Sequence, residues 1–307
     1  MSKTDPKFFI RPSLTEKQIE ADVATYLGWI SPSGRRPFVL RDLCETTTGA
    51  DKSINVGALI HMQFKRSLGL KSESIVPISR AKNRSHLESI RQYRASEELE
   101  ENPTLFFRLH RLTGKEYQHN TLMKYERPPW SRAIYVAPLF LDLPSYESAL
   151  FAEPRYLHDP FRYQMTTRIW HEKWISIFGQ TPFLRGHVSI PPHEHVTTHH
   201  HYYAYSTTGT EITWHSDPKK LPNHDYRFSS FLGNFIRESI RNSEATRSLS
   251  ELADFTAESM SEAKYQRKSD PLLQLEAHAR GLLERDSIRT FAVLYNSEFL
   301  EDLRGEI

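Results

Sequence analysis

Two short segments of the sequence carry residues suited to phosphodiester chemistry. Residues 48–51 (TGAD) end in Asp51, and residues 63–65 (QFK), which begin twelve positions after Asp51, contain Gln63 and Lys65. A carboxylate and an amide oxygen are ligands that a hard cation such as Mg²⁺ accepts. A nearby lysine can orient or deprotonate an attacking water, or stabilise charge on a phosphate. The two segments together predict a metal-dependent site.

The residues between these segments alternate in the manner of a β-hairpin. Successive side chains of a strand point to opposite faces, which places Gln63 and Lys65 on one polar face. Gly57 lies midway, where a hairpin turn needs a permissive residue. With a loop at residues 56–58, Asp51 stands directly opposite Gln63, at a Cβ separation of about 4.5–5.5 Å. One cation then bridges both side chains, and Lys65 points into the same space.

Residues 15–27 predict an amphipathic helix before the hairpin. Its apolar stripe consists of Ile19, Val23, Tyr26 and Leu27. Ser13 or Thr15 can cap its first turn. Glu16 and Glu20 lie one turn apart on one side of this helix, so either carboxylate is a candidate for the site.

The TGAD and QFK segments resemble the PD-(D/E)xK nuclease superfamily, in the variant with glutamine in place of the second acid. Members carry a glutamate on the helix before the hairpin, which implies Glu20 as the counterpart and Glu16 as the alternative. The resemblance implies a catalytic set of Glu20, Asp51, Gln63 and Lys65, in which Glu20, Asp51 and Gln63 hold Mg²⁺ or Mn²⁺.

The same resemblance implies an endonuclease that cleaves nucleic acid, DNA rather than RNA, in defence against foreign DNA. Gln63 removes one negative charge from the metal site, so the alternative is a catalytically inactive nuclease-fold protein. Such a protein binds nucleic acid or regulates a partner. A third interpretation is a non-nuclease interaction protein in which the two segments coincide by chance.

The rest of the chain predicts an α/β fold. The patterns favour helices over residues 85–98 and 115–125 and strands over 103–110 and 133–138. Beyond residue 222 we expect helices over 226–242, 249–267 and 271–285, a strand over 289–295 and a last helical turn or two over 297–304. The resemblance implies a restriction-endonuclease-like mixed β-sheet core flanked by helices, in a domain of residues 1–222. A mainly helical C-terminal region of residues 223–307 follows, and its helices either pack on the core or form a surface for a protein partner.

Positive charge gathers directly after the QFK segment. Residues 65–94 contain eight basic side chains against Glu73 and Glu88: Lys65, Arg66, Lys71, Arg80, Lys82, Arg84, Arg91 and Arg94. Positive charge beside a metal centre suits a polyphosphate backbone. Arg66, Arg80, Lys82 and Arg84 are therefore the candidate nucleic-acid contacts, and the alternative is a solvated loop and helix face.

Six histidines crowd residues 187–201: His187, His193, His195, His199, His200 and His201. No spacing among them matches a zinc motif, and no cysteine lies with them. We expect strand-rim imidazoles that hydrogen-bond locally or touch nucleic acid. Tyr202, Tyr203, Tyr205 and Trp214 are able to stack on bases, but aromatic residues of strands are more often core.

Composition excludes several classes of protein. No apolar run approaches the roughly 20 residues that cross a bilayer, and the first five residues lack an apolar signal core. The single cysteine, Cys44, forbids an intrachain disulfide and favours a reducing, cytoplasmic location. No GxxxxGK[ST] segment occurs, so any energy-dependent step needs another polypeptide. The sequence leaves the oligomeric state open.

Overall fold

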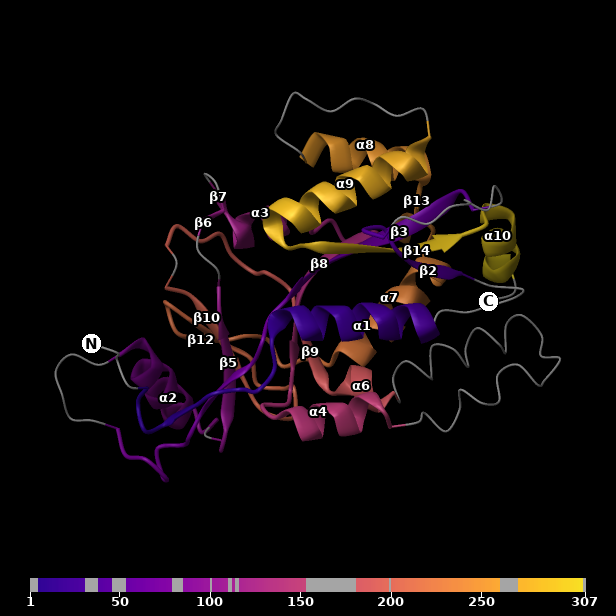
Figure 1. Ribbon diagram of the computed structural model, residues 1–307. Helices are drawn as coiled ribbons and strands as arrows, with labels where there is room; N and C mark the ends of the chain where they lie inside the picture. The colour runs from indigo at the N-terminus through magenta and orange to yellow at the C-terminus, as the bar shows by residue number, and fades with distance from the viewer. Residues whose placement is uncertain are drawn as a thin grey trace.

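The computed structural model describes residues 5–30, 38–45, 54–78, 85–99, 101–109, 112–113, 116–152, 181–198, 200–259 and 270–305. Within these ranges the chain forms a mixed α/β fold with two multi-stranded sheets (Figure 1). The predicted α/β class is confirmed at this level. None of the described helices combines the length and apolar character that a membrane crossing needs.

One sheet, here called the central sheet, contains the strand that carries Gln63. Its strand order is β2 (Val39–Asp42), β14 (Arg289–Tyr295), β3 (Val56–Phe64), β8 (Ser131–Pro138) and β9 (His187–Ile190), and β13 (Arg247–Ser248) pairs with the start of β3. β3 runs antiparallel to β14 and parallel to β8. β3 is buried on both faces, because its neighbours cover its edges and helices cover its faces.

A second, antiparallel sheet packs beside the first. Its order is β1 (Phe9–Ile10), β4 (Leu68–Leu70), β5 (Thr104–Arg108), β10 (Tyr202–Tyr205), β11 (Thr213–His215) and β12 (Lys219–Lys220). A separate two-stranded ribbon consists of β6 (Leu112–Thr113) and β7 (Glu116–Tyr117). The aromatic side chains of β5 and β10 that face the central sheet form a shared core with β8 and β9.

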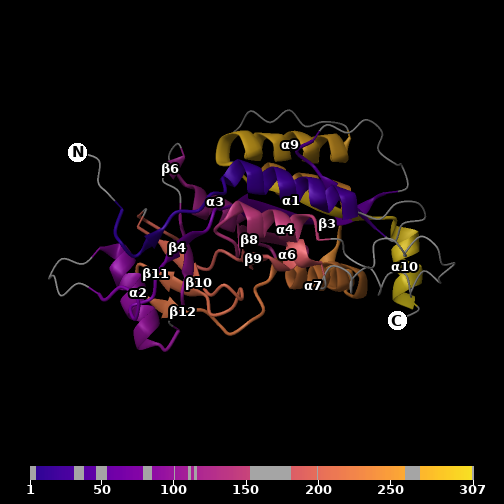
Figure 2. The ribbon, with the colours of Figure 1, turned by 60° about the horizontal axis from the view of Figure 1, so that its bottom comes forward.

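Helices cover both faces of the central sheet (Figures 1 and 2). α8 (Leu249–Ser259) and α9 (Pro271–Asp286) pack on one face, and α1 (Glu16–Ile30) and α7 (Phe228–Arg241) pack on the other. The remaining described helices are α2 (His86–Ser96), α3 (Gln118–Lys124), α4 (Leu143–Leu150), α6 (Pro182–Arg185), the 3-10 turn η1 (Ser243–Ala245) and α10 (Ser297–Gly305). α2 lies against the outer face of the second sheet, where Ile90 packs with Leu70 and Phe106.

Local sequence signals fix several helix starts. Ser85 caps α2 by accepting from the Glu88 amide, while the Glu88 side chain accepts from the Ser85 amide, which is a capping box. Asp270 caps α9 by accepting from the amides of Leu272 and Leu273, and Pro271 occupies the first turn as expected. These short signals explain why both predicted helices are confirmed.

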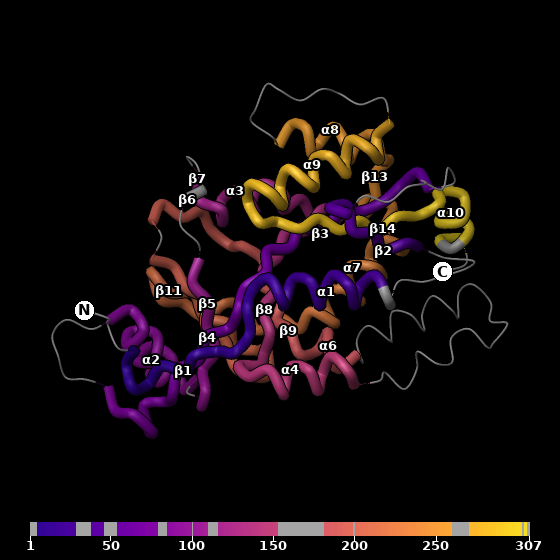
Figure 3. The backbone as a smooth tube through the Cα atoms, in the orientation of Figure 1, coloured from indigo at the N-terminus to yellow at the C-terminus, as the bar shows by residue number. Residues whose placement is uncertain are grey.

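The chain after residue 222 supplies a strand in the middle of the central sheet. Figure 3 shows β14 running beside β3, although more than 220 residues separate them in the sequence. The predicted strand over residues 289–295 is confirmed. The predicted division at residue 222 stays a prediction about folding units, but residues of both parts share this one sheet.

Candidate functional site

The predicted hairpin between Asp51 and Gln63 is wrong where the structure describes it. Residues 56–64 form one continuous strand, and Gly57 lies inside it rather than in a turn. Gly57 is required for a different reason, since a Cβ there would lie 2.8 Å from the carbonyl oxygen of Val293 on β14. Asn55 and Gln63 are therefore separated by about 26 Å along an extended chain. Asp51 lies outside the described residues.

Gln63 and Lys65 lie at the carboxyl end of β3. Because β3 and β8 are parallel, their carboxyl ends lie at the same edge of the sheet. Ligands of open α/β sheets bind beyond such strand ends. The two side chains share the face that α3 and α9 cover, as shown by the contact of Gln63 with Asp286 and of Lys65 with Tyr135. The strand therefore places both predicted residues together at an edge suited to a site.

The charged group of Lys65 is buried and makes no hydrogen bond within the part of the chain that the structure describes. Its side chain is 1% exposed, and its Nζ has no hydrogen-bond partner among the described residues. The nearest aromatic ring is that of Tyr135, whose centroid lies 5.9 Å from Nζ. Burial lowers the pKa of Lys65 from 10.5 to about 8, while the negative charge of Glu16 opposes that shift. The amine thus sits in a setting that disfavours its charge.

Gln63 is engaged with the backbone rather than with another side chain. Its Nε2 donates to the carbonyl oxygen of Asp286 at 3.4 Å, and Gln118 Nε2 donates to the same oxygen. The Oε1 atom of Gln118 is buried without a partner among the described residues. Two amides thus converge on the end of α9, next to the lysine.

Glu20 belongs to a separate ion-pair network. Arg289 Nε donates to Glu20 Oε1 at 2.9 Å, and its guanidinium also pairs with Asp42 and, at 3.6 Å, with Glu45. Arg289 is paired with Met62 across the β14–β3 ladder, so its side chain shares the face of Met62 and not that of Gln63. Burial lowers the pKa of Arg289, but the ion pairs with Glu20 and Asp42 outweigh burial and raise the pKa above its ordinary value. Glu20 and Gln63 are therefore on opposite faces of the sheet.

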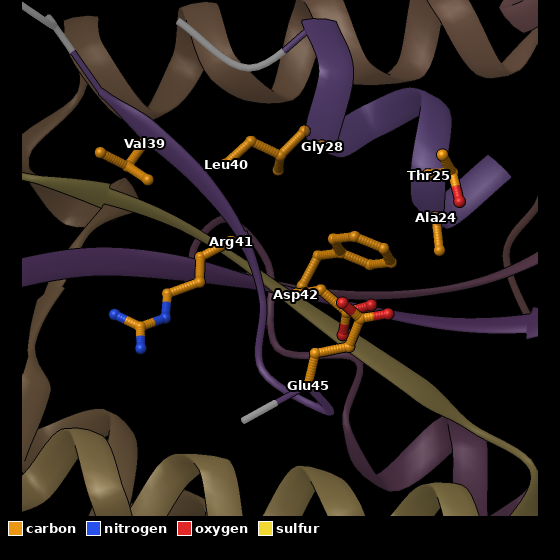
Figure 4. A pocket seen from close by; sticks show the side chains of 9 residues that line it. Ala24, Thr25, Gly28, Val39, Leu40, Arg41, Asp42 and Glu45 are labelled. Carbon is orange, nitrogen blue, oxygen red and sulfur yellow. The ribbon is translucent and has the colours of Figure 1, made fainter. Parts of the chain in front are cut away.

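A cavity of about 470 Å³ borders this network (Figure 4). Figure 4 shows the carboxylates of Asp42 and Glu45 close together, with the Arg41 guanidinium pointing away from them. Arg41 pairs instead with Glu276 of α9, at 2.6 Å. The acidic groups beside the cavity thus share Arg289 as a cation.

The described residues do not fit an Mg²⁺ site. No three His, Cys, Asp or Glu side chains gather as possible ligands in the part of the chain that the structure describes. Glu20 is held by Arg289, a cation, and Gln63 lies on the other face of the sheet. The expected metal ligands were Glu20, Asp51 and Gln63. The two of them that the structure describes, Glu20 and Gln63, do not lie together.

The basic stretch after the QFK segment divides into buried and exposed cations. Arg91 and Arg94 are 4% and 1% exposed, and both donate to backbone carbonyl oxygens. They hold α2 to the second sheet and are not available to a phosphate backbone. Arg66 is exposed. The other candidate contacts, Arg80, Lys82 and Arg84, lie outside the described residues.

Three histidines of the histidine-rich segment make contacts within the fold. His193 Nδ1 lies 2.9 Å from the Tyr203 hydroxyl, and the His201 ring stacks on Trp214. Burial lowers the pKa of His193 to about 4, with Glu194 opposing the shift. His187 is fully buried and contacts the Phe183 carbonyl oxygen at 2.8 Å. Local hydrogen bonding, one of the two expectations for these imidazoles, is what these three show.

The residues that surround Gln63 and Lys65 carry no signal in the sequence. Tyr135, Gln118 and Asp286 contact the Gln63 and Lys65 face, yet they lie more than fifty residues from it in the chain. No local pattern indicates such contacts, because they depend on the pairing of β3 with β8 and β14.

Comparison of the chain with protein-family models, with curated proteins and with solved structures finds no match. What the site can do therefore follows from its own residues.

Proposed function

We propose that this protein acts on nucleic acid at the carboxyl end of β3, as a phosphodiester hydrolase in which Lys65 contacts the reacting phosphate or transfers a proton. The buried amine of Lys65 carries this proposal. A buried charge without a partner destabilises a fold by several kcal/mol. A phosphate oxygen is the kind of acceptor that this amine lacks.

The lowered pKa of Lys65 suits proton transfer. With a pKa of about 8, a fraction of the amine is neutral near neutral pH and can accept a proton. The protonated fraction instead pairs with a phosphate oxygen, which lysine binds as a point charge. Gln63, two residues before it, adds an amide that can orient the same ligand.

Mg²⁺ remains an expectation from the resemblance to PD-(D/E)xK nucleases. The described residues supply no ligand set for it, and we assign it no step. DNA as substrate and a role in defence are likewise proposals that rest on that resemblance.

Binding without hydrolysis is the second candidate function. It is favoured by Arg289, which pairs with both Glu20 and Asp42 where a nuclease would use acids to hold a metal ion. In this alternative the chain binds nucleic acid or regulates a partner protein through the same architecture.

A cleavage assay separates the two candidates. Single-stranded and duplex DNA and RNA are incubated with wild type, Lys65→Ala and Lys220→Ala, each with Mg²⁺, Mn²⁺ or EDTA. Lys220 is an exposed lysine of β12 and serves as the matched control. We expect cleavage by wild type and by Lys220→Ala, and a loss of about a hundredfold or more in Lys65→Ala.

Equal cleavage by Lys65→Ala would contradict the proposed role of the lysine. Binding of nucleic acid by wild type with no cleavage of any substrate would establish the second candidate instead.

A further inference from the structure

A cavity of about 380 Å³ lies beyond the carboxyl end of β8, and we call it the edge pocket. The described residues that line it are 139–140 after β8, 182 and 185–186 in and directly after α6, 207–208 after β10, and 227 before α7. α6 and α7 lie side by side (Figure 2). Because β8 runs parallel to β3, the edge pocket lies at the same edge of the central sheet as Lys65.

Two glycines let the walls of the edge pocket approach each other closely. A Cβ at Gly186 would lie 2.7 Å from Cζ of the Phe140 ring, and the Leu139 amide donates to the Gly186 carbonyl oxygen at 2.8 Å. Gly209 has a φ of +75°, and a Cβ there would lie 3.3 Å from Leu139 and 3.4 Å from Arg227. The two residues after β8 are thus held between the end of α6 and the loop after β10.

The charged side chains of the described lining are two arginines, with no carboxylate among them. Arg185 is exposed, and its guanidinium forms no hydrogen bond or ion pair within the part of the chain that the structure describes. Arg227 is half-buried and donates from Nε to the Thr208 carbonyl oxygen at 3.2 Å, while its terminal nitrogens bond to no other described residue. The edge pocket therefore offers two guanidinium groups to an anion.

Two carboxylates lie near the lining and accept from neighbouring groups. Glu101 accepts from the Thr207 amide at 2.8 Å and from the Thr207 hydroxyl. Asp225 accepts from the Arg227 amide at 3.0 Å and from the Ser230 hydroxyl at 2.6 Å. α7 begins directly after Arg227 without a side-chain cap, and the positive end of its dipole favours an anion there. Both acids lie outside the lining, so the charged groups of the lining itself are cations.

We propose that the edge pocket binds the 5′-phosphate of a nucleotide, with Arg185 and Arg227 on the phosphate and the apolar side chains beside the nucleoside. A phosphate monoester carries about 1.5 to 2 negative charges at neutral pH, which matches two guanidinium groups better than a phosphodiester does. Leu139, Phe140 and Pro182 supply the apolar part of the lining. The cavity lies within the size range of small-molecule sites, about 300–1,000 Å³.

Binding in this pocket needs neither Lys65 nor a cleaved bond, so it is independent of the proposed hydrolysis. The same phosphate chemistry comes from two sources, a free nucleotide and the 5′-phosphorylated end of a nucleic-acid strand. Separate measurements distinguish these sources.

Calorimetric titration of the full chain with adenosine 5′-monophosphate in EDTA tests the free-nucleotide source. We expect the nucleotide to bind at least about tenfold more tightly than adenosine, because only the nucleotide carries the charge that the arginines pair with. Arg185→Gln and Arg227→Gln should each weaken nucleotide binding about tenfold or more. Inorganic phosphate should compete with the nucleotide for wild type.

The matched control is Arg127→Gln, because Arg127 is an exposed arginine before the amino end of β8, the opposite end of that strand. It should leave the nucleotide affinity within about twofold, since salt screens distant surface charges. Arg185→Lys keeps the charge and should lose less affinity than Arg185→Gln. Arg185→Gln should keep the melting temperature of wild type, because no described residue bonds to this exposed guanidinium.

Fluorescence anisotropy with labelled single strands tests the strand-end source. One oligonucleotide carries a 5′-phosphate, the other a 5′-hydroxyl group, and both carry the dye at the 3′ end. A preference for the phosphorylated strand that Arg185→Gln abolishes assigns the pocket to a strand end. Binding of adenosine 5′-monophosphate without such a preference assigns it to a free nucleotide.

The proposal is overturned if wild type binds neither the nucleotide nor the 5′-phosphate of a strand, or if adenosine binds as tightly as the nucleotide. It is also overturned if the Arg185→Gln and Arg227→Gln variants bind as wild type does, or if Arg127→Gln loses as much. Cleavage of nucleic acid without either kind of phosphate binding would overturn this inference and leave the proposed hydrolase standing. Phosphate binding in the pocket without cleavage would do the reverse.

Discussion

At the scale of single residues, the buried amine of Lys65 destabilises the fold and is at the same time suited to bind a phosphate or to transfer a proton. Its amine is buried without an acceptor among the described residues, and burial lowers its pKa to about 8. A lysine that served only the fold would be better replaced by an apolar side chain of similar length. The proposed phosphate contact explains why a lysine occupies this position, which packing alone does not explain.

Lys65→Met should stabilise the protein at neutral pH. The folded pKa of about 8 lies below the ordinary 10.5, so the unfolded chain binds more protons between these values and stability rises with pH across that window. Below pH 8 the full cost of about 3 kcal/mol is present, and the variant escapes it. Urea unfolding at several pH values should show a gain that is largest at pH 7 and shrinks as pH rises from 8 to 10.5.

Lys220→Met, at an exposed site, is the control and should show no such pH trend. A Lys65→Met variant that is less stable than wild type at neutral pH would mean that the amine has a stabilising partner.

Arg289 is the second residue whose role the structure defines. Arg289→Gln should lower the free energy of unfolding by about 2–3 kcal/mol, because it leaves the Glu20 and Asp42 carboxylates without their shared cation. The same change should let Mg²⁺ or Mn²⁺ raise the melting temperature more than in wild type. Thermal unfolding with and without each ion measures both effects.

Arg237→Gln, which removes a half-buried arginine of α7 whose guanidinium donates to Asn234, should show neither effect. Equal stabilisation of wild type and Arg289→Gln by the ions would place a metal site elsewhere and contradict the interpretation that Arg289 occupies the place of a metal ion between Glu20 and Asp42.

At the scale of elements, β3 shows how a correct residue pattern led to a wrong strand pairing. Gly57 between two alternating segments favoured a turn, but the run from Val56 to Phe64 continues as one buried strand. The glycine is needed because β14 approaches closely there. Sequence pattern alone does not distinguish these two uses of glycine, since the neighbouring strand comes from residues 289–295.

Gly57→Val should therefore destabilise the fold by about 2 kcal/mol or more, through a clash with the Val293 carbonyl oxygen. Gly281→Ala, inside α9 where an added Cβ meets nothing within 4 Å, should instead stabilise it by about 0.5–1 kcal/mol. Chemical denaturation compares the two directly. A neutral Gly57→Val would contradict the close approach of β14.

The elements with their own local signals were predictable. The helices over 86–96 and 271–286 carry caps in the sequence, and the strand over 289–295 is an apolar run bounded by polar residues. The candidate site was predictable only in part. The spacing of Gln63 and Lys65 places them on one face, but their neighbours Tyr135 and Asp286 follow from sheet order, which no local pattern encodes.

At the scale of the whole molecule, the N-terminal and C-terminal parts of the chain share one sheet. β14 lies between β2 and β3, and α7 packs into the same core as α1. Residues 1–222 alone would leave the edges of β2 and β3 unpaired. The central sheet therefore depends on the chain beyond residue 222.

A fragment of residues 1–222 should accordingly fail to fold independently. Circular dichroism and thermal unfolding of this fragment should show no cooperative transition, and adding a separate fragment of residues 223–307 should restore one. A cooperative transition in the isolated fragment would show that the sheet forms without β14.

A titration of Lys65 by NMR measures directly whether a nucleic-acid phosphate reaches this amine. Lysine labelled with ¹³C at Cε reports the pKa of each amine by NMR, and the Lys65→Met variant identifies the Lys65 signal. In the free protein that signal should titrate with a pKa of about 8. With saturating oligonucleotide in EDTA, we expect the pKa of Lys65 to rise by one or more, because a phosphate oxygen stabilises the charged amine. An unchanged titration of Lys65 under conditions where anisotropy confirms binding would contradict the proposed contact between Lys65 and a phosphate.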